Sequence, residues 1–206
     1  MRISIVLFDG FELLDVFGPA ELFGFIEDWD VKYLAPTLEP VASAQGVQVL
    51  PDNTYADLTE TDLLLVPGGR GTRVLVEDAP FINWLKTAGS QAQIVSSVCT
   101  GSALLAQAGV LENHRATSNK RAFAWASSFG ENITWEPSAR WVHSENRWTS
   151  SGIAAGIDMA AALIAELKSP EVRDEICERA EIKITKDPEN DPFSVNEKLN
   201  AQEGVS

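Results

Sequence analysis

The sequence is poor in the residues that build disulfide frameworks and metal sites. Its 206 residues include two cysteines, Cys99 and Cys177, and two histidines, His114 and His143. None of the four stands at the spacing of a structural zinc site, and two cysteines are too few for the disulfide framework of a small secreted protein. We expect no disulfide, no metal and no other cofactor, so any chemistry has to come from one thiol and its neighbours.

A long hydrophobic run is also missing from the start of the chain. The first apolar run, Ile3 to Phe8, has the length of a β-strand. It lacks a signal-peptide cleavage region, and it falls short of the roughly 18 residues that a membrane span needs. We therefore expect a cytoplasmic protein that does not associate with a membrane.

Basic residues are scarce as well. The 16 Lys and Arg stand against 30 Asp and Glu, which gives a formal net charge of −14. Such a charge repels polyanions, and few cations are left to neutralise phosphates. We expect a small molecule as the partner of this protein, and no nucleic acid.

Length and composition predict one domain. Hydrophobic residues make up 45% of the chain and charged residues 22%, which is ordinary for a globular protein of this size. From Lys186 onward the sequence turns polar and carries two Asp-Pro pairs. We expect one domain over residues 1–193 and a flexible tail over residues 194–206.

The order of apolar runs and helix signals predicts an α/β fold. Ile3 to Phe8, Leu63 to Val66 and Ile94 to Val98 lack polar alternation, as is typical of parallel strands covered on both faces. Helix signals lie between and after them, at Asp78-Ala79-Pro80 and in the alanine-rich segment Ala154 to Leu167. We expect a flavodoxin-like, doubly wound, mostly parallel sheet sandwiched between helices, with ligands bound at the carboxyl ends of the strands.

Cys99 is the strongest candidate for a reactive group. It follows the apolar run Ile94 to Val98, with Ser97 two positions before it and Gly101 two positions after it. Small residues at this spacing are typical of a nucleophile elbow, a strained strand-to-helix turn. The start of the next helix would lower the pKa of the thiol and activate it. The alternative is that Cys99 is a small buried apolar residue.

A glycine turn stands at the end of another predicted strand. Gly68 and Gly69 follow Leu63 to Val66 and Pro67. Backbone N–H groups in such a turn can approach a ligand closely and could form an oxyanion hole, although an ordinary tight turn would look the same. The turn lacks the spacing of a dinucleotide fingerprint, so we infer no nicotinamide cofactor.

Asp15 is an acid in apolar surroundings, within the segment Leu14 to Phe17. Burial would raise the pKa of its carboxyl into the range where a carboxyl can transfer protons. The alternative role for an acid here is to cap a helix, and we assign that role to Glu21, because Gly18-Pro19 is typical of a helix start.

Together these segments resemble the ThiJ/PfpI superfamily of the class I glutamine amidotransferase-like fold. The resemblance extends from Arg2 to Phe193. The motifs that carry it are DVFGPAE at 15–21, VPGG at 66–69, SVCTGS at 97–102, ATSNK at 116–120, TSSGIAAGID at 149–158 and DPENDPF at 187–193.

Within the superfamily the chain is most similar to the isonitrile hydratase group. There an aspartate replaces the more widespread glutamate beside the nucleophilic cysteine, and a threonine follows the cysteine; Asp15 and Thr100 stand at those places. The resemblance implies hydration of an isonitrile to an N-substituted formamide through a thioimidate on Cys99. It implies Cys99, Asp15 and Thr100 as catalytic groups, a homodimer, and a substrate or oxyanion site formed by Gly68, Gly69, Gly101, Ser151 and Gly152.

Other activities of the superfamily stay open as alternatives. PfpI-type proteases carry histidine directly after the cysteine, where this chain has Thr100, and we expect His114 and His143 at the surface or at helix ends. A ligand-binding or redox-sensing module, a glyoxalase and an amidase-type hydrolase are the remaining alternatives. We expect Ser118 to Arg121 to line the substrate pocket. The other apolar candidates, Cys177, Trp125, Trp135, Trp141 and Trp148, fit the core or an interface.

Overall fold

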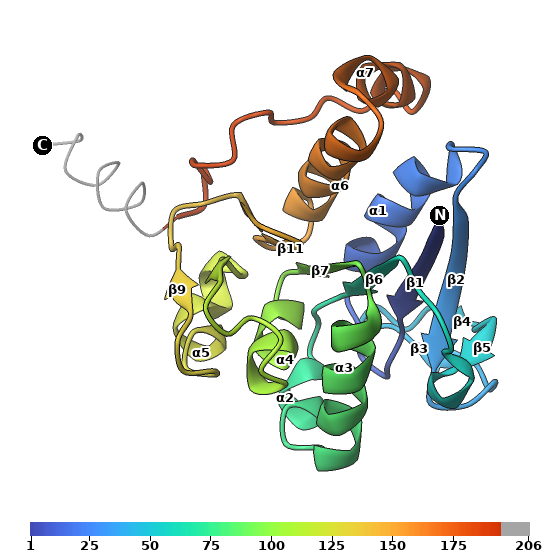
Figure 1. Cartoon of the computed structure of the whole chain (residues 1–206), viewed down its shortest axis with the longest axis vertical. Helices are drawn as coiled ribbons and strands as arrows, with labels where there is room; N and C mark the ends of the chain where they lie inside the picture. The colour runs from blue at the N-terminus through green and yellow to red at the C-terminus, as the bar shows by residue number, and fades with distance from the viewer. Residues whose placement is uncertain (195–206) are drawn as a thin grey trace, which may run out of the picture.

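The computed structural model describes residues 1–194, and Figure 1 shows a sheet with helices on both faces. Apart from Ser194, the predicted tail lies outside the described residues. The sheet has the strand order β10-β11-β7-β6-β1-β2-β5, and all its pairs are parallel except β10 with β11. This confirms the predicted mostly parallel sheet. Its strands are β1 (Arg2–Val6), β2 (Asp30–Ala35), β5 (Asn53–Thr54), β6 (Leu63–Val66), β7 (Ile94–Val98), β10 (Trp141–Ser144) and β11 (Arg147–Ser150).

Two layers of helices cover the sheet (Figure 1). One layer holds α1 (Leu13–Gly24), α6 (Ala155–Leu167) and α7 (Pro170–Arg179), and the other holds α2 (Thr72–Leu75), α3 (Ala79–Gln91), α4 (Gly101–Gln107) and α5 (Phe123–Ala126). Short 3-10 turns, η1 (Tyr55–Asp57) and η2 (Lys120–Ala122), and two small ladders complete the fold. The ladders join β3 (Val41–Ala42) with β4 (Gln48–Val49), and β8 (Arg115–Ala116) with β9 (Thr134–Trp135).

The central strands are apolar because both of their faces are covered. All four residues of β6 are fully buried, as are Ile3 and Ile5 of β1. Side chains on both faces of these strands leave water, which supplies the main free energy for layering the helices on the sheet. None of the helices described within residues 1–194 has the length and hydropathy that a membrane span requires.

The start of α3 confirms its sequence signal, and the start of α7 is built in the same manner. Asp78 accepts a hydrogen bond from the N–H of Phe81 at the start of α3, and Pro80 stands in its first turn. In the same way Ser169 accepts from the N–H of Val172 at the start of α7. Each oxygen satisfies a backbone donor that the helix itself leaves unpaired.

The predicted start of α1 is wrong. The helix begins at Leu13, Pro19 lies inside it, and Glu21 is an exposed residue of the helix body that caps nothing. Gly18 serves helix packing, because a Cβ there would lie 2.7 Å from Cγ1 of Ile157 on α6. The glycine therefore lets two helices approach closely. This contact between distant segments cannot be recognised from the local sequence around Gly18.

Residues 180–194, which follow α7, contain no helix or strand and run back across the protein (Figure 1). The N–H of Arg140 donates to the carbonyl of Pro188 at 2.7 Å. Buried Arg140 also binds Asp158 of α6 through Nε at 2.6 Å and Asp191 through Nη1 at 3.4 Å. These ionic contacts fasten the arm to the domain, and all three charges have buried partners.

Candidate active site

The groups singled out in the sequence meet at one edge of the sheet. Asp15 lies on the helix that follows β1, Gly68 follows β6, Cys99 follows β7, and Ser151 follows β11. Because β11, β7, β6 and β1 are parallel neighbours, their carboxyl ends lie side by side. The fold thus places the candidate groups at the edge where doubly wound sheets bind ligands.

Cys99 is the turn residue of a nucleophile elbow between β7 and α4. Its φ of +58° is rare for a residue with a side chain. The close packing around the turn requires Gly101, because a Cβ there would lie 2.2 Å from the carbonyl oxygen of Val66. The N–H of Cys99 donates to the carbonyls of Ser150 and Ser151, both at 3.2 Å. Contacts on both sides therefore hold the strained backbone in place.

The carboxyl of Asp15 is fully buried. Its Oδ2 accepts the N–H of Gly68 at 2.9 Å, and Oδ1 has no hydrogen-bond partner of standard geometry among residues 1–194. Burial raises the pKa of Asp15 to about 7; the Gly68 N–H opposes this shift, and the nearby Cys99 thiol favours the carboxylate more weakly. Asp15 is therefore balanced between its acid and base forms near neutral pH.

Cys99 differs from the prediction in its accessibility and in its pKa. The residue is only 6% exposed, so the sulfur is enclosed instead of standing at an open cleft. Burial raises the pKa of the thiol, and the charge of Asp15 raises it further. The N–H of Thr100 at the helix start favours the thiolate, but less than these effects oppose it. In the resting pair, Asp15 therefore loses its proton before Cys99 does.

Asn119 contacts the sulfur, which the sequence did not reveal. Its Nδ2 donates to Sγ of Cys99 at 3.2 Å, while its Oδ1 accepts the N–H groups of Arg121 and Ala122 and thereby fixes the amide orientation. Gly152 makes room for this side chain, since a Cβ there would lie 2.1 Å from Nδ2. The sequence signal closest to this contact is the segment Ser118 to Arg121, which is predicted to line the substrate pocket and contains Asn119. In the structure Asn119 is the N-cap residue of η2.

The glycine turn plays a different part from the predicted oxyanion hole. The N–H of Gly68 is taken by Asp15, and that of Gly69 donates to Oγ1 of Thr100 at 3.1 Å. Both donors thus already have protein acceptors. The turn instead packs on the elbow, because a Cβ on Gly68 would lie 2.5 Å from the nitrogen of Thr100 and 2.8 Å from Cβ of Cys99.

Thr100 is tied to the neighbouring turn through its hydroxyl. Besides accepting from Gly69, its Oγ1 lies 3.1 Å from Oγ1 of Thr72 at the start of α2. Thr72 in turn donates to the carbonyl of Gly69 at 2.7 Å. The side chain thus joins α2, the glycine turn and the elbow, and it is well placed to hold Cys99 in position.

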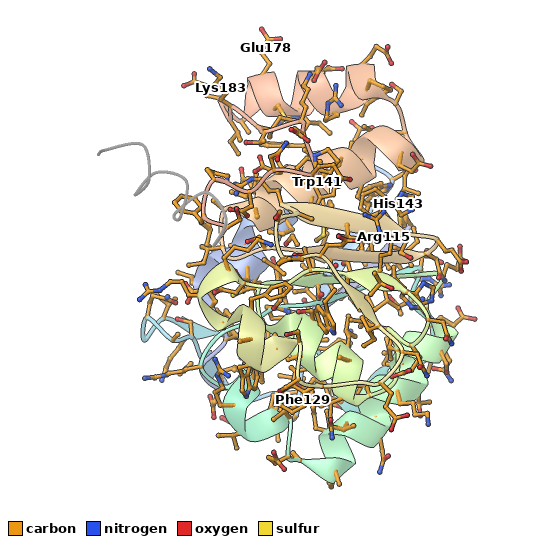
Figure 2. The ribbon with its side chains drawn as sticks, turned by 90° about the vertical axis from the view of Figure 1, so that its left-hand side faces the viewer. Arg115, Phe129, Trp141, His143, Glu178 and Lys183 are labelled. Atoms are coloured by element: carbon orange, nitrogen blue, oxygen red, sulfur yellow. The ribbon has the colours of Figure 1, made fainter. Side chains whose placement is uncertain are left out.

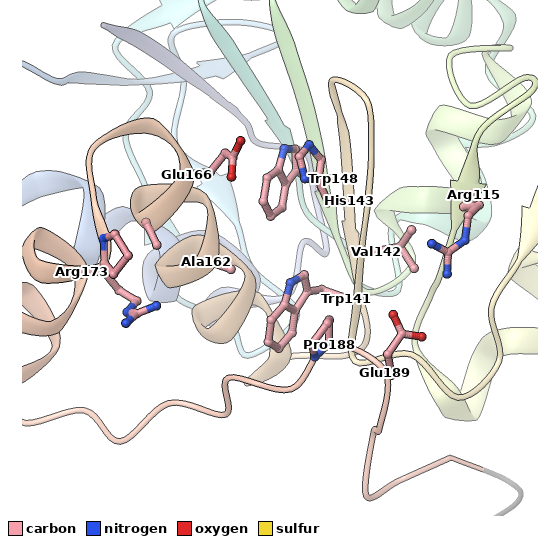
Figure 3. A pocket seen from close by; sticks show the side chains of 12 residues that line it. Arg115, Trp141, Val142, His143, Trp148, Ala162, Glu166, Arg173, Pro188 and Glu189 are labelled. Atoms are coloured by element: carbon pink, nitrogen blue, oxygen red, sulfur yellow. The ribbon is translucent and has the colours of Figure 1, made fainter.

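The two histidines lie elsewhere. His143 stacks on Trp148 with ring centroids 3.9 Å apart, and His114 lies against Ser144. Figure 2 shows His143 in one region with Trp141 and Arg115. A pocket of about 410 Å³ opens there, between the β10–β11 hairpin, α6 and the C-terminal arm (Figure 3). Cys99 does not line this pocket, and within residues 1–194 neither histidine forms a hydrogen bond with Cys99 or Asp15, so the described residues show no Cys-His-acid triad.

The described residues contain no cluster of three or more His, Cys, Asp or Glu side chains that could hold a metal ion. Cys177 is a buried residue of α7. The site that the structure assembles therefore consists of one thiol, one carboxyl and one amide, supported by the Thr100 hydroxyl and the glycine turn. Such a set can add a nucleophile to a small electrophile and transfer the accompanying protons.

The chain is similar to known proteins along most of its length. Isonitrile hydratase of Pseudomonas putida is 35% identical over 167 residues, which cover 81% of this chain and 72% of that protein. The glutathione-independent glyoxalase DJR-1.2 of Caenorhabditis elegans is 24% identical over 68% of this chain and 75% of its own. The crystal structure of a ThiJ/PfpI family protein from Pseudomonas syringae covers 98% of this chain and 84% of its own at a TM-score of 0.84 and 27% identity. The DJ-1/PfpI family model matches residues 1–166, and the chain belongs to the DJ-1/PfpI family.

Proposed function

We propose that the protein is a cysteine-dependent enzyme that hydrates an isonitrile to an N-substituted formamide. The observation that carries the proposal is the Asp15 carboxyl, whose pKa lies at about 7, beside the elbow thiol of Cys99. The combination of aspartate at this place with Thr100 after the cysteine favours the hydratase over the glyoxalase branch. The similarity to the Pseudomonas putida hydratase supports the same choice.

In the first step the sulfur of Cys99 bonds to the isonitrile carbon. The carboxylate of Asp15 takes the thiol proton and delivers it to that carbon, so the product is a thioimidate in which the carbon carries hydrogen and is double-bonded to nitrogen. Asn119 supports the step because its Nδ2 already donates to Sγ and stabilises the charge that develops there. No cofactor is required for this addition.

In the second step water adds to the thioimidate carbon. One water proton passes to the nitrogen, the hydroxyl proton passes through Asp15 to sulfur, and the carbon–sulfur bond breaks. The products are the N-substituted formamide and the regenerated thiol. The same carboxyl thus acts as base and acid, which a pKa near the working pH allows. Thr100 holds the elbow and the glycine turn in register while the bonds change.

Turnover of an aryl isonitrile tests the proposal. The wild-type protein and the variants Cys99→Ala and Cys177→Ala are incubated with the isonitrile, and formamide is quantified by liquid chromatography. We expect formamide from the wild type and from Cys177→Ala, whose thiol lies in α7, and none above background from Cys99→Ala. Absence of formamide from folded wild type, or loss of methylglyoxal in its place, would refute the hydratase assignment.

A further inference from the structure

An arginine and a tryptophan stack on each other across two segments of the active site. The guanidinium carbon of Arg73 lies 3.4 Å from the ring centroid of Trp125. Arg73 belongs to α2 and Trp125 to α5, which lie with α4 in the same helix layer (Figure 1). The stack therefore joins two elements that come from different parts of the sequence.

Each of these two elements is fastened to the reactive centre by the residues next to the stack. Thr72 precedes Arg73 and contacts Oγ1 of Thr100 at 3.1 Å, directly after the nucleophile. On the other side, the segment that leads into α5 begins with Asn119, whose amide donates to Sγ of Cys99 at 3.2 Å. The Arg73–Trp125 stack thus bridges the two segments that hold the thiol from either side.

The guanidinium of Arg73 is available to a ligand. Its side chain is exposed, and within residues 1–194 it forms no ion pair and donates no side-chain hydrogen bond, whereas Arg2, Arg115, Arg140 and Arg173 all bind carboxylates. Arg70 and Arg121 also form no ion pair within the described residues, but of these three guanidinium groups Arg73 is the one that stacks on an aromatic ring and interacts electrostatically with Cys99. Stacking on the indole leaves the N–H groups at the edge of the guanidinium free to bind a carboxylate in bidentate fashion.

The guanidinium also lies within electrostatic reach of the thiol. Partial burial lowers the pKa of Arg73, and negative charge on Cys99 opposes that shift. An arginine keeps its charge at any working pH. Thr72, the neighbour of Arg73, contacts Thr100, the neighbour of Cys99, so an anion bound to Arg73 would lie on the side of the site that α2 forms.

We propose that Arg73, held flat by Trp125, binds a carboxylate group on the small electrophile that Cys99 attacks. This inference rests on the proposed function for the reacting group, and the substrate class is then an isonitrile that carries a carboxylate. The product is the corresponding N-formyl carboxylate. The carboxylate takes no part in bond making or breaking; it places the isonitrile carbon against the sulfur.

Matched substrates test the inference. We compare isocyanoacetate with 2-isocyanoacetamide, and 4-isocyanobenzoate with 4-isocyanobenzamide, so that two distances between carboxylate and isonitrile carbon are covered. In the wild type we expect kcat/KM to favour at least one carboxylate over its amide by about tenfold or more, the range of one charge-assisted pair. Arg73→Gln should abolish that preference, and Arg73→Lys should restore part of it.

The control is Arg179→Gln, which also removes a guanidinium stacked on an aromatic ring, 4.4 Å from the ring centroid of Phe25, but on α7. It should keep the wild-type preference. The ratio of kcat/KM for the carboxylate substrate to kcat/KM for its amide separates carboxylate binding from a general effect of Arg73 on thiol reactivity. A general effect would change the rates of both substrates equally. A wild type with no preference, or an Arg73→Gln variant that retains it, overturns the inference.

A second measurement separates the inference from the proposed function. Alkylation of Cys99 by iodoacetate, relative to iodoacetamide, is followed by mass spectrometry of the peptide that contains Cys99. We expect the ratio of the two rates to fall by about tenfold in Arg73→Gln. A fall of this ratio without any isonitrile turnover supports carboxylate binding and refutes the hydratase assignment, whereas an unchanged ratio overturns the role of Arg73.

Discussion

The carboxyl of Asp15 lies in a buried site beside the Cys99 thiol, where its pKa is raised from 3.8 to about 7. A base must be ionised to take the thiol proton. We therefore expect kcat/KM for an isonitrile to rise with pH as it passes through about 7. A profile measured with the wild type and with Asp15→Asn checks this: the variant should lose most of the activity, and a wild-type rate that stays flat through neutral pH contradicts the role of Asp15.

The raised pKa of Asp15 also means that its ionised carboxylate destabilises the folded protein at high pH. The pKa is higher in the folded than in the unfolded chain, so this group's contribution to stability is greatest below about pH 4 and is lost as pH rises to about 7. Asp15→Asn keeps an oxygen acceptor for the Gly68 N–H without the buried charge. We expect the variant to be more stable than wild type at about pH 8, by on the order of 2 to 4 kcal/mol.

Denaturant unfolding at about pH 5 and about pH 8 measures this difference. The gain from Asp15→Asn should shrink at the lower pH, where the wild-type carboxyl is mostly protonated. An equal gain at both pH values would show that the ionisation of Asp15 is not its cause.

At the scale of elements, the close approach of the glycine turn to the elbow is the feature most open to test. Gly68→Ala would place a Cβ 2.5 Å from the nitrogen of Thr100, and that nitrogen belongs to backbone that cannot move aside easily. We expect a loss of stability of about 1 to 3 kcal/mol and a loss of activity, because the elbow shifts. Thermal unfolding and isonitrile turnover measure the two effects.

Gly24→Ala is the matched control. A Cβ on this residue at the end of α1 would meet no heavy atom within 4 Å. Alanine is the better helix former, so stability should stay equal or rise by up to about 1 kcal/mol, with unchanged activity. If both substitutions behaved alike, the packing of the turn against the elbow would not explain the effect.

Element by element, the sequence predicted what depends on local pattern and missed what depends on contacts between distant segments. The apolar run Leu63 to Val66 could be recognised as a strand, because a strand that is buried on both faces has a continuous apolar sequence. The elbow around Cys99 could be recognised because small residues flank the cysteine at fixed spacing. The start of α1 could not, because Gly18 serves a contact with Ile157 of another helix. Asn119 was placed in the pocket lining, but its hydrogen bond to sulfur depends on how two loops meet.

The pKa of Cys99 shows a related limit. The position after β7 at a helix start predicted a lowered value, and the real environment is dominated by burial and by the Asp15 charge. Both are consequences of the complete fold. The resemblance to a known family indicates which reaction to expect. Which of Asp15 and Cys99 loses its proton first depends on burial and charge in the folded protein.

At the scale of the whole molecule, the C-terminal arm is joined to the domain by buried charges. Asp191 is 1% exposed and binds Arg140, which also binds Asp158 of α6 and whose carbonyl accepts the N–H of Ser151 beside the elbow. Asp191→Ala leaves part of a buried cation unpaired. We expect the substitution to cost about 1 to 3 kcal/mol, because Arg140 keeps its shorter contact with Asp158 and loses one charge-assisted partner.

Denaturant unfolding measures this loss, with Glu189→Ala as the control, because Glu189 is exposed on the same arm and its side chain has no hydrogen bond or ion pair within residues 1–194. The control should lie within about 0.5 kcal/mol of wild type. Equal, small effects of both substitutions would show that the arm is not held by its buried charge. The homodimer that the resemblance implies stays a prediction, which the mass of the protein in solution decides.

The proposed hydration depends above all on a covalent bond between Cys99 and the isonitrile carbon. Rapid mixing of the protein with an aryl isonitrile, followed by acid quench and mass spectrometry, tests it most directly. We expect a transient gain of one isonitrile mass on the peptide that contains Cys99, which decays as formamide appears and is absent from Cys99→Ala. Formation of formamide at the wild-type rate by Cys99→Ala would rule out covalent catalysis by this thiol.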